Sequence, residues 1–435
     1  MTDAGVAAPS LGGRTTHAHG ARDRRVWLAV AVLVVVLPHA PGLTTDFGRS
    51  LLTQMGIAIV FALSYNVLFG ETGLLSFGHA VYFGLGGYAA IHCMRAINHG
   101  LPLPMPFVPL AGAAGGLVCG LAFGALTTRR AGTIFALISL GVGELVYAAT
   151  FLLPGLFGGE EGITASRTRA LALPGLDLGS QLQVYYVVAA WALVSAAAMR
   201  AFTRTPVGRL CNAVRDNPER VQFVGYDPQR IRFIAFAVAG LFAGVAGGLH
   251  ALNYEIVAAD AVGAQRSGSV LVMAYMGGTG SFAGPVVGAI VLTWLETSLS
   301  GYTSAWLLYV GLIFIAIILF APAGLWGIVA MHAPILHTRA LRRVLACYAV
   351  ALLPGAIMVA GAAALIEMSY RLSTQRELGS VVKLGPLALD ASTPVPWIAG
   401  AAMLVGGLVL LRISARFVAV AWQAATLEAR GGGAP

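Results

Sequence analysis

Long apolar runs, separated by short polar or basic segments, fill most of the chain between residues 26 and 411. A helix of about 20 apolar residues spans a bilayer because it satisfies its own backbone hydrogen bonds. The pattern therefore predicts an all-α polytopic membrane protein, a bundle of about 10–12 transmembrane helices. The runs have the approximate bounds 26–37, 51–69, 74–94, 107–126, 132–153, 184–199, 233–252, 269–275, 285–299, 305–320, 344–366 and 397–411.

The run 269–275 is too short to cross a bilayer and leads into Gly277-Gly278-Thr279-Gly280. We expect a broken or re-entrant helix over 269–280, which is allowed where protein or a water-filled cavity covers the backbone. If this segment does not cross, the orientation of every later helix inverts. An earlier turn, Gly70-Glu71-Thr72-Gly73, has a similar pattern, and the two turns together hint at a repeated architecture.

The composition excludes an ordinary soluble globule, because 58% of the 435 residues are hydrophobic and 10% are charged. An average soluble domain has roughly 25% charged residues. The net charge of +9 comes from arginines between the apolar runs, as the positive-inside rule describes, so we expect no nucleic-acid partner. With the N-terminus in the cytoplasm, one crossing per run puts the basic loop 203–232 in the cytoplasm. We expect a multi-pass membrane protein in contact with membrane lipid.

The pattern predicts three regions: a cytoplasmic tail (1–25), a transmembrane domain with a cytoplasmic loop (26–330), and an extension with a transmembrane hairpin (331–435). The one lysine, Lys383, follows Val382, so the chain lacks the Gly-Lys-Ser/Thr sequence of a phosphate-binding loop. Any nucleotide-driven motor must then be a separate polypeptide, and we do not expect this chain to be an enzyme. The four cysteines form no CxxC pair, which indicates no metal site.

The loop 203–232 carries three pairs of a helix-capping residue and a proline: Thr205-Pro206, Asn217-Pro218 and Asp227-Pro228. Each pair favours the start of a helix, because the side chain accepts from a free amide and proline lacks the amide that would have no partner. The middle pair predicts a two-turn helix over 218–224, ended by Gly225. Such a helix suits docking to a soluble motor; a solvated basic loop is the alternative.

Several motifs, in order over about residues 45–327, resemble the LivM-type permeases of branched-chain amino acid ABC importers. They are Asn66 to Ala80 (NVLFGETGLLSFGHA), Gly84 to Tyr88, the loop residues Gly208-Arg209, Arg215 to Asn217 and Gly225, Phe242 to Leu249, Gly277 to Ser281 with Gly284-Pro285, and Phe320 to Leu325. The chain departs from the family in having Val221-Gln222 where alanines are usual, and in the residues that follow the usual end.

The resemblance implies a multi-pass protein of the bacterial inner (plasma) membrane. It also implies an importer built with a homologous second permease subunit, two cytoplasmic ATP-binding subunits and an extracytoplasmic solute-binding protein. ATP would be bound by those partner subunits, and this chain would need no cofactor. The loop residues that the resemblance assigns to ATPase coupling are Arg215, Asn217, Pro218, Glu219 and Gly225.

Polar residues and opened backbone inside membrane spans are candidates for a substrate pathway. The candidates here are Asn66, Gly73, Ser76, His79, Gly84, Glu144, Gly277 and Gly280. For each of them, tight packing or a hydrogen bond between helices is the alternative. His250 and Glu296 lie near predicted span ends and are expected to reach the membrane interface.

The expected function is ATP-driven import of branched-chain or other small amino acids. A permease of the same family for urea or short amides is one alternative. An ion-coupled secondary transporter is another, and it would need protonatable groups deep in the bundle, for which Glu144 is the candidate. A lipid-modifying enzyme is disfavoured because no interfacial His/Asp cluster accompanies the acidic residues.

Overall fold

A computed structural model describes residues 15–168, 178–335, 340–374, 379–384 and 387–431. Residues 1–14 of the predicted tail and 432–435 of the predicted extension therefore lie outside the described residues. Contacts divide the chain into two units, Met1–Ser298 with Ile317–Leu325, and Leu299–Ala316 with Trp326–Pro435. We call them the first and second units and describe each by itself. The boundary expected near residue 330 stays a prediction.

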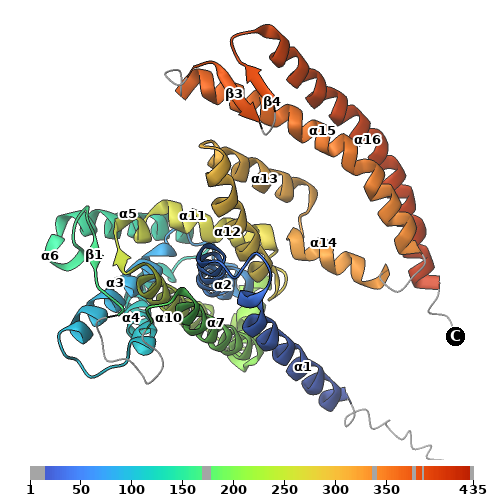
Figure 1. The fold of residues 1–435 in the computed structure, drawn as a ribbon. Coiled ribbons are helices and arrows are strands. Elements are labelled where there is room, and N and C mark those ends of the chain that lie inside the picture. Colours follow the sequence, from blue (N-terminus) through green and yellow to red (C-terminus); the bar gives the residue numbers. More distant parts are fainter. Residues whose placement is uncertain (1–14, 169–177, 336–339, 375–378, 385–386, 432–435) are drawn as a thin grey trace, which may run out of the picture. The chain divides into compact units, whose positions relative to one another are not determined.

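The described residues are mainly helical (Figure 1). The longer helices are α1 (Thr15–Val36), α2 (Asp46–Thr72), α3 (Ala80–Asn98), α4 (Val108–Thr127), α5 (Thr133–Leu152), α7 (Gln181–Arg204), α8 (Pro206–Asp216), α10 (Pro228–Tyr254), α11 (Ala264–Gly277), α12 (Gly284–Tyr302), α13 (Trp306–Phe320), α14 (Gly324–His332), α15 (Ala340–Thr374) and α16 (Pro394–Gly431). The short elements are η1 (Leu37–His39), η2 (Met105–Phe107), α6 (Pro154–Phe157), β1 (Ile163–Thr164), α9 (Pro218–Phe223), β2 (Ile256–Val257), η3 (Ala259–Val262), η4 (Ala333–Ile335), β3 (Val381–Leu384) and β4 (Leu387–Asp390).

All twelve predicted apolar runs fall largely on helices, and the all-α polytopic class is confirmed. Among the described residues, seven helices are each long and apolar enough to cross a membrane: α2, α4 with η2, α5, α7, α10, α15 and α16. The pair α13 and α14, bent by 49°, would make an eighth crossing. The predicted number of spans is larger because it also counts the runs on α1, α3, α11 and α12, which do not meet both criteria.

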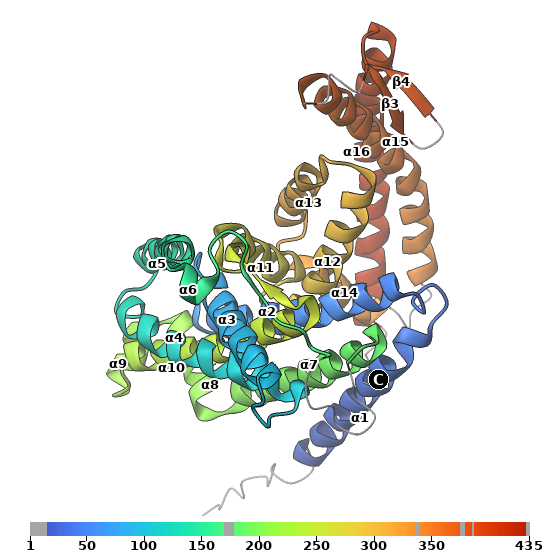
Figure 2. The same cartoon turned by 60° about the vertical axis from the view of Figure 1, so that its left-hand side comes forward.

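Glycine brings α3, α4 and α10 into close contact at the centre of the first unit (Figure 2). A side chain at Gly244 of α10 would overlap the carbonyl oxygen of Gly112 in α4, and one at Gly86 of α3 would meet Gly244. Small residues let helix backbones approach closely where lipid provides no hydrophobic driving force. This explains why so many of the glycines lie inside apolar runs.

The chain breaks after α2 and re-enters the core. Gly73 ends α2 with a φ of 72°, a left-handed conformation that favours glycine. Residues 74–79 are not helical, yet the Nε2 of His79 lies 3.0 Å from the hydroxyl of Ser64, well inside α2. Phe77 of this segment donates its amide to the Ser139 hydroxyl, and Ala80, the first residue of α3, donates its amide to the Ser267 hydroxyl, each over 3.0 Å. Thus α3 begins at mid-depth in the unit.

A second break runs in the opposite direction. After α10, β2 and η3 lead back into the core, and α11 begins near the start of α3, since Ser267 accepts from the amide of Ala80. The rings of Tyr275 in α11 and Phe69 in α2 lie 4.9 Å apart, so α11 runs toward the end of α2 that carries Gly73. With 14 residues, α11 is about 21 Å long, too short to span a bilayer alone. Residues 264–277 therefore form a half-helix, as expected for a broken or re-entrant segment.

The second unit contains a long helical hairpin at the place of the predicted one. Its helices α15 and α16 lie side by side (Figure 1; Figure 2) and are joined through the antiparallel strands β3 and β4, with Val381 opposite Asp390. The carboxylate of Glu367 in α15 accepts hydrogen bonds from Thr303, at 2.6 Å, and from Tyr309, at 3.0 Å. This partly buried network ties α15 to the start of α13 within the unit.

Candidate functional site

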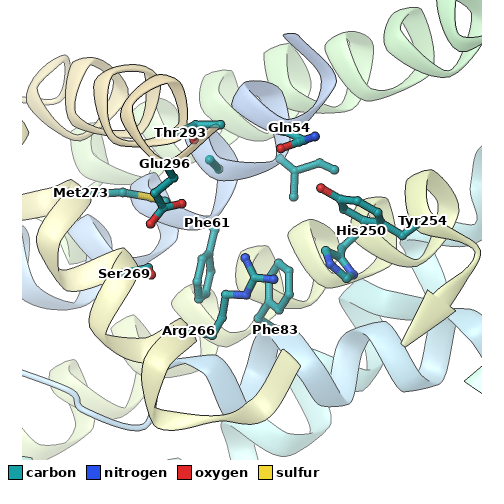
Figure 3. A pocket seen from close by; sticks show the side chains of 12 residues that line it. Gln54, Phe61, Phe83, His250, Tyr254, Arg266, Ser269, Met273, Thr293 and Glu296 are labelled. Carbon is teal, nitrogen blue, oxygen red and sulfur yellow. The ribbon is translucent and has the colours of Figure 1, made fainter. Parts of the chain in front are cut away.

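A pocket opens inside the first unit between five helices, with about 500 Å³ of empty space counted out to its mouth (Figure 3). Its walls are Gln54, Ile57, Ala58 and Phe61 of α2, Phe83 of α3, His250 and Tyr254 of α10, Arg266, Ser269 and Met273 of α11, and Thr293 and Glu296 of α12. The α2 residues all precede Ser64, and His250 and Tyr254 lie at the end of α10 opposite Pro228. The pocket therefore lies away from the end of α2 that carries Gly73.

Aromatic rings form one wall of the pocket (Figure 3). The ring centroids of Phe61 and Phe83 are 4.7 Å apart, and those of Phe83 and His250 are 5.3 Å apart. His250 in turn lies 4.5 Å from the ring of Tyr254. This row of tilted and edge-on rings combines a large apolar surface with a polar edge at the imidazole and the phenol.

Two opposite charges face the pocket from different helices. The guanidinium of Arg266 lies over the Phe83 ring, 5.4 Å from its centroid, in a cation–π contact. The carboxylate of Glu296 is on α12, and the Ser269 hydroxyl faces it (Figure 3). Among the residues that the structure describes, neither charge belongs to an ion pair within 4.0 Å. The pocket thus presents a cation and an anion that are not directly paired.

Buried polar groups continue from the pocket toward the end of α2. The rings of Tyr65 and His79 are 5.3 Å apart. The Tyr65 hydroxyl, the Asn66 side-chain oxygen, the Ser76 hydroxyl and the Nδ1 of His79 are buried without a hydrogen-bond partner. Buried polar atoms normally have partners, so these four unpartnered groups are unusual for the interior of a helical bundle. Phe69 and Tyr275 lie at the end of this cluster that is nearest to Gly73.

Three of the eight predicted pathway residues are thus buried. Ser76 and His79 belong to the segment 74–79, and Asn66 is on α2. Gly84 packs against Ala261 and Val262 of η3, and Gly277 packs against Gly284. These two positions serve close backbone contact in the structure.

The other three predicted residues lie elsewhere. Gly73 caps α2 and lies against the side chain of Arg215. Gly280 is exposed, and Glu144 is exposed on α5 at the edge of the first unit (Figure 1). None of the eight candidates, all of them described residues, lines the pocket. Their assignment to a substrate pathway stays a prediction.

The three predicted capping pairs begin helices. Thr205 accepts from the amide of Gly208 at 3.1 Å, Asn217 from Arg220 at 3.0 Å, and Asp227 from Gln229 at 2.8 Å. The middle helix, α9, spans Pro218–Phe223, and Gly225 follows it with a φ of 92°. The prediction of a short, separately capped helix is confirmed.

The loop helices pack on α2 and α10. Arg215 of α8 donates to the carbonyl of Gly70, and the Asn212 amide donates to Glu71 at 2.6 Å. These bonds fix α8 to the last turn of α2, so we call this side of the first unit the loop end and the opposite side the far end. Glu219 is exposed.

A small apolar core holds α8 and α9 together. Val221, where the LivM-type family usually has alanine, is buried with Cys211, Val214 and Ile231, whereas Gln222 is exposed. Burial, with a further contribution from Glu71, raises the pKa of the Cys211 thiol to about 12. Phe223 and Val224 point away from this core, with 89% and 75% of their surfaces exposed.

The pocket was not predicted from the sequence. His250 and Glu296 were expected to reach the membrane interface, but they line the pocket, because α10 and α12 converge on the start of α11. Arg266 was not considered, since it precedes the run 269–275. Its position directly before an interrupted, Gly-flanked helix is the signal that could have identified it. Among the residues that the structure describes, no group of three or more His, Cys, Asp or Glu could hold a metal ion.

Comparisons with known proteins identify the family. The family described as branched-chain amino acid transport system / permease component matches residues 49–322. The LivM permease proteins of high-affinity branched-chain amino acid transport in Salmonella typhimurium and Escherichia coli K12 are each 25% identical. They align over 68% and 73% of this chain and over 74% and 77% of their own lengths.

A probable LivH permease protein of Methanocaldococcus jannaschii is 24% identical over 66% of this chain and 95% of its own length. No solved structure matches the chain. The family is one of transport permease components, which are not themselves enzymes, and with the apolar helices it makes the chain a multi-pass inner-membrane protein. The chain belongs to the permease-component family of branched-chain amino acid transport systems.

Proposed function

We propose that this chain is the permease subunit of an ATP-driven importer that carries a branched-chain or other small amino acid, as the names of its relatives state for them. The observation that carries the proposal is the loop end. There, α8 is bonded to the last turn of α2 while α9 presents an exposed apolar end.

The contacts of α8 form a short route for force. Arg215 and Asn212 bind Gly70 and Glu71 at the end of α2. The neighbouring residue Phe69 contacts the ring of Tyr275 in the half-helix α11. A push on α8 therefore moves α2 against α11, between the pocket and the loop end. Packed helices transmit such shifts because their interfaces repack rather than deform.

The exposed end of α9 suits docking of a soluble ATPase. Phe223 and Val224 are adjacent and mostly exposed at the loop end, with Tyr226 exposed close by in the sequence, and contiguous exposed apolar surface in water marks interaction sites. A cytoplasmic ATP-binding subunit would cover them, bind and hydrolyse ATP, and leave this chain without a cofactor of its own. Two such subunits would serve the two permeases of one importer.

Glu144 supports a second permease subunit. It lies within the apolar helix α5 and is exposed, next to the open position Gly141. An ionised carboxylate at this depth is costly against lipid, so protein or a water-filled path should cover this face. A homologous subunit packed on α5 would provide that cover and place the substrate path between the two subunits.

The pocket position fits import. If the loop end is cytoplasmic, the pocket lies in the outer half of the membrane, where an extracytoplasmic binding protein would release its amino acid. The aromatic residues Phe69 and Tyr275 lie between the pocket and the cytoplasm. ATP-driven movement of α8 would then open the inner side of the path.

The test is the variant Phe223→Ser, with Phe47→Ser as its matched control. Both phenylalanines are highly exposed, Phe47 at the far end of the first unit. We expect Phe223→Ser to reduce ATP-dependent leucine uptake by the complete importer at least tenfold, and to lose co-purification of the ATPase subunits. Phe47→Ser should leave both within twofold of wild type. Unchanged uptake and co-purification in Phe223→Ser would overturn the coupling role of α9.

A further inference from the structure

The pocket offers complementary groups for both ends of an amino acid. Arg266 and Glu296 carry opposite charges on α11 and α12, and neither is in an ion pair among the described residues. A guanidinium binds a carboxylate through paired N–H donors. A carboxylate, with the Ser269 hydroxyl beside it, accepts hydrogen bonds from an ammonium group.

The rest of the pocket is suited to an apolar side chain. Phe61 and Met273 face it near the two charges (Figure 3), and Ile57 also lines it. The empty space of about 500 Å³ out to the mouth is within the range of roughly 300–1,000 Å³ for small-molecule sites. An aliphatic amino acid of leucine size therefore has both room and apolar contact.

Charge balance gives the pocket a preference. Arg266 and Glu296 are both partly buried and attract each other without direct contact. A ligand that brings a counter-charge into direct contact with each of them gains more than their mutual attraction provides. A zwitterion does this, whereas a neutral amide or urea supplies no charge to either group. A site built to bind a polar group of its ligand strongly rejects an analogue that lacks this group, because the polar side chains of the site are then left unpaired.

We infer that this pocket is an intramembrane site for the zwitterion of an aliphatic α-amino acid, with Arg266 binding its carboxylate and Glu296 binding its ammonium group. The inference rests on the proposed function, because it takes the chain to be the conduit of an amino-acid importer. It adds a solute site in the permease itself and excludes urea and short amides as preferred ligands.

Ligand binding to the purified permease complex without the solute-binding protein tests the inference, read as the shift in thermal unfolding temperature with leucine. We expect wild type to be stabilised by leucine and not by leucinamide or urea. Arg266→Gln and Glu296→Gln should each weaken leucine binding at least tenfold. The neighbouring exposed residue of α11 gives the control Gln265→Ala, which should bind leucine as wild type does.

Truncated ligands separate the two roles. Glu296→Gln should bind 4-methylpentanoate, which lacks the ammonium group, at least as well as leucine. Arg266→Gln should do the same for 3-methylbutylamine, which lacks the carboxylate. Met273→Trp keeps both charges and fills the pocket, so it should also lose leucine binding. This variant keeps the test decisive if a charge variant does not fold.

Different results would overturn the proposed function and the pocket inference. If wild type takes up neither leucine nor any other small amino acid with ATP and all partner subunits, the proposed function is wrong. If wild type takes up leucine while Arg266→Gln, Glu296→Gln and Met273→Trp bind it as wild type does, the pocket inference alone is wrong. Equal stabilisation of wild type by leucinamide and leucine would also overturn the inference.

Discussion

Glycines, which have no side chain, set the distance between α4 and α10. At Gly244 an added Cβ would overlap the backbone of Gly112 and Gly116, and backbone cannot swing aside as a side chain can. Overpacking a tight contact typically costs about 1–3 kcal/mol, and the cost is higher where neither backbone can move. We predict that Gly244→Ala lowers the thermal unfolding midpoint of the detergent-solubilised protein by several degrees.

Gly155 gives the control for this prediction. It is also in a helix, α6, but has no atom within 4 Å of an added Cβ. Gly155→Ala should leave the unfolding midpoint unchanged. Equal midpoints for Gly244→Ala and wild type would show that α4 and α10 do not pack as closely as described.

Individual site residues were harder to predict than packing residues. The sequence pointed to Asn66, Ser76 and His79, because polar residues stand out in apolar runs, and the structure buries them together. It did not point to Arg266, because a basic residue before an apolar run normally marks a span end. That Arg266 and Glu296 line the same pocket depends on how α11 and α12 fold together, which the periodicity of apolar residues does not show.

The loop helices behave as one packed element, and the Cys211 thiol in α8 reports it. Cys211 is buried, and its pKa is raised to about 12. At pH 7.5 such a thiol has roughly a thousandth of the thiolate of an ordinary exposed cysteine. We predict that N-ethylmaleimide modifies Cys211 at least a hundredfold more slowly than a cysteine introduced by Phe223→Cys.

Each rate is measured in a variant that retains a single cysteine. As the pH rises through 9, the rate at the introduced cysteine should level off, whereas Cys211 stays largely protonated until the pH approaches 12. Because folding raises this pKa, its effect on loop stability is absent below the ordinary thiol pKa and becomes unfavourable above it. Similar rates for the two cysteines at pH 7.5 would mean that α8 and α9 are not packed on α10.

Elements were predicted well where a local signal exists. Capping pairs identified α8, α9 and the start of α10, since those hydrogen bonds form within a few residues. Apolar runs located the long helices. The non-helical segment 74–79 was not predicted, because Phe77 within it and Ala80 directly after it bind Ser139 and Ser267, which are distant in the sequence.

For the molecule as a whole, an importer subunit and an ion-coupled transporter differ in their source of energy. Proton- or ion-coupled transport requires the coupling ion to bind this chain, whereas the importer takes its energy from ATP bound to other subunits. The family match and the exposed α9 both support the importer. The two mechanisms differ in what the isolated chain can do.

The most direct measurement is therefore uptake of radiolabelled leucine into proteoliposomes, with the purified chain alone and with the complete complex. We predict no uptake by the chain alone under a proton or sodium gradient. We predict uptake by the complete complex when ATP is supplied to the side that carries the ATPase subunits. Gradient-driven leucine uptake by the chain alone would contradict the account.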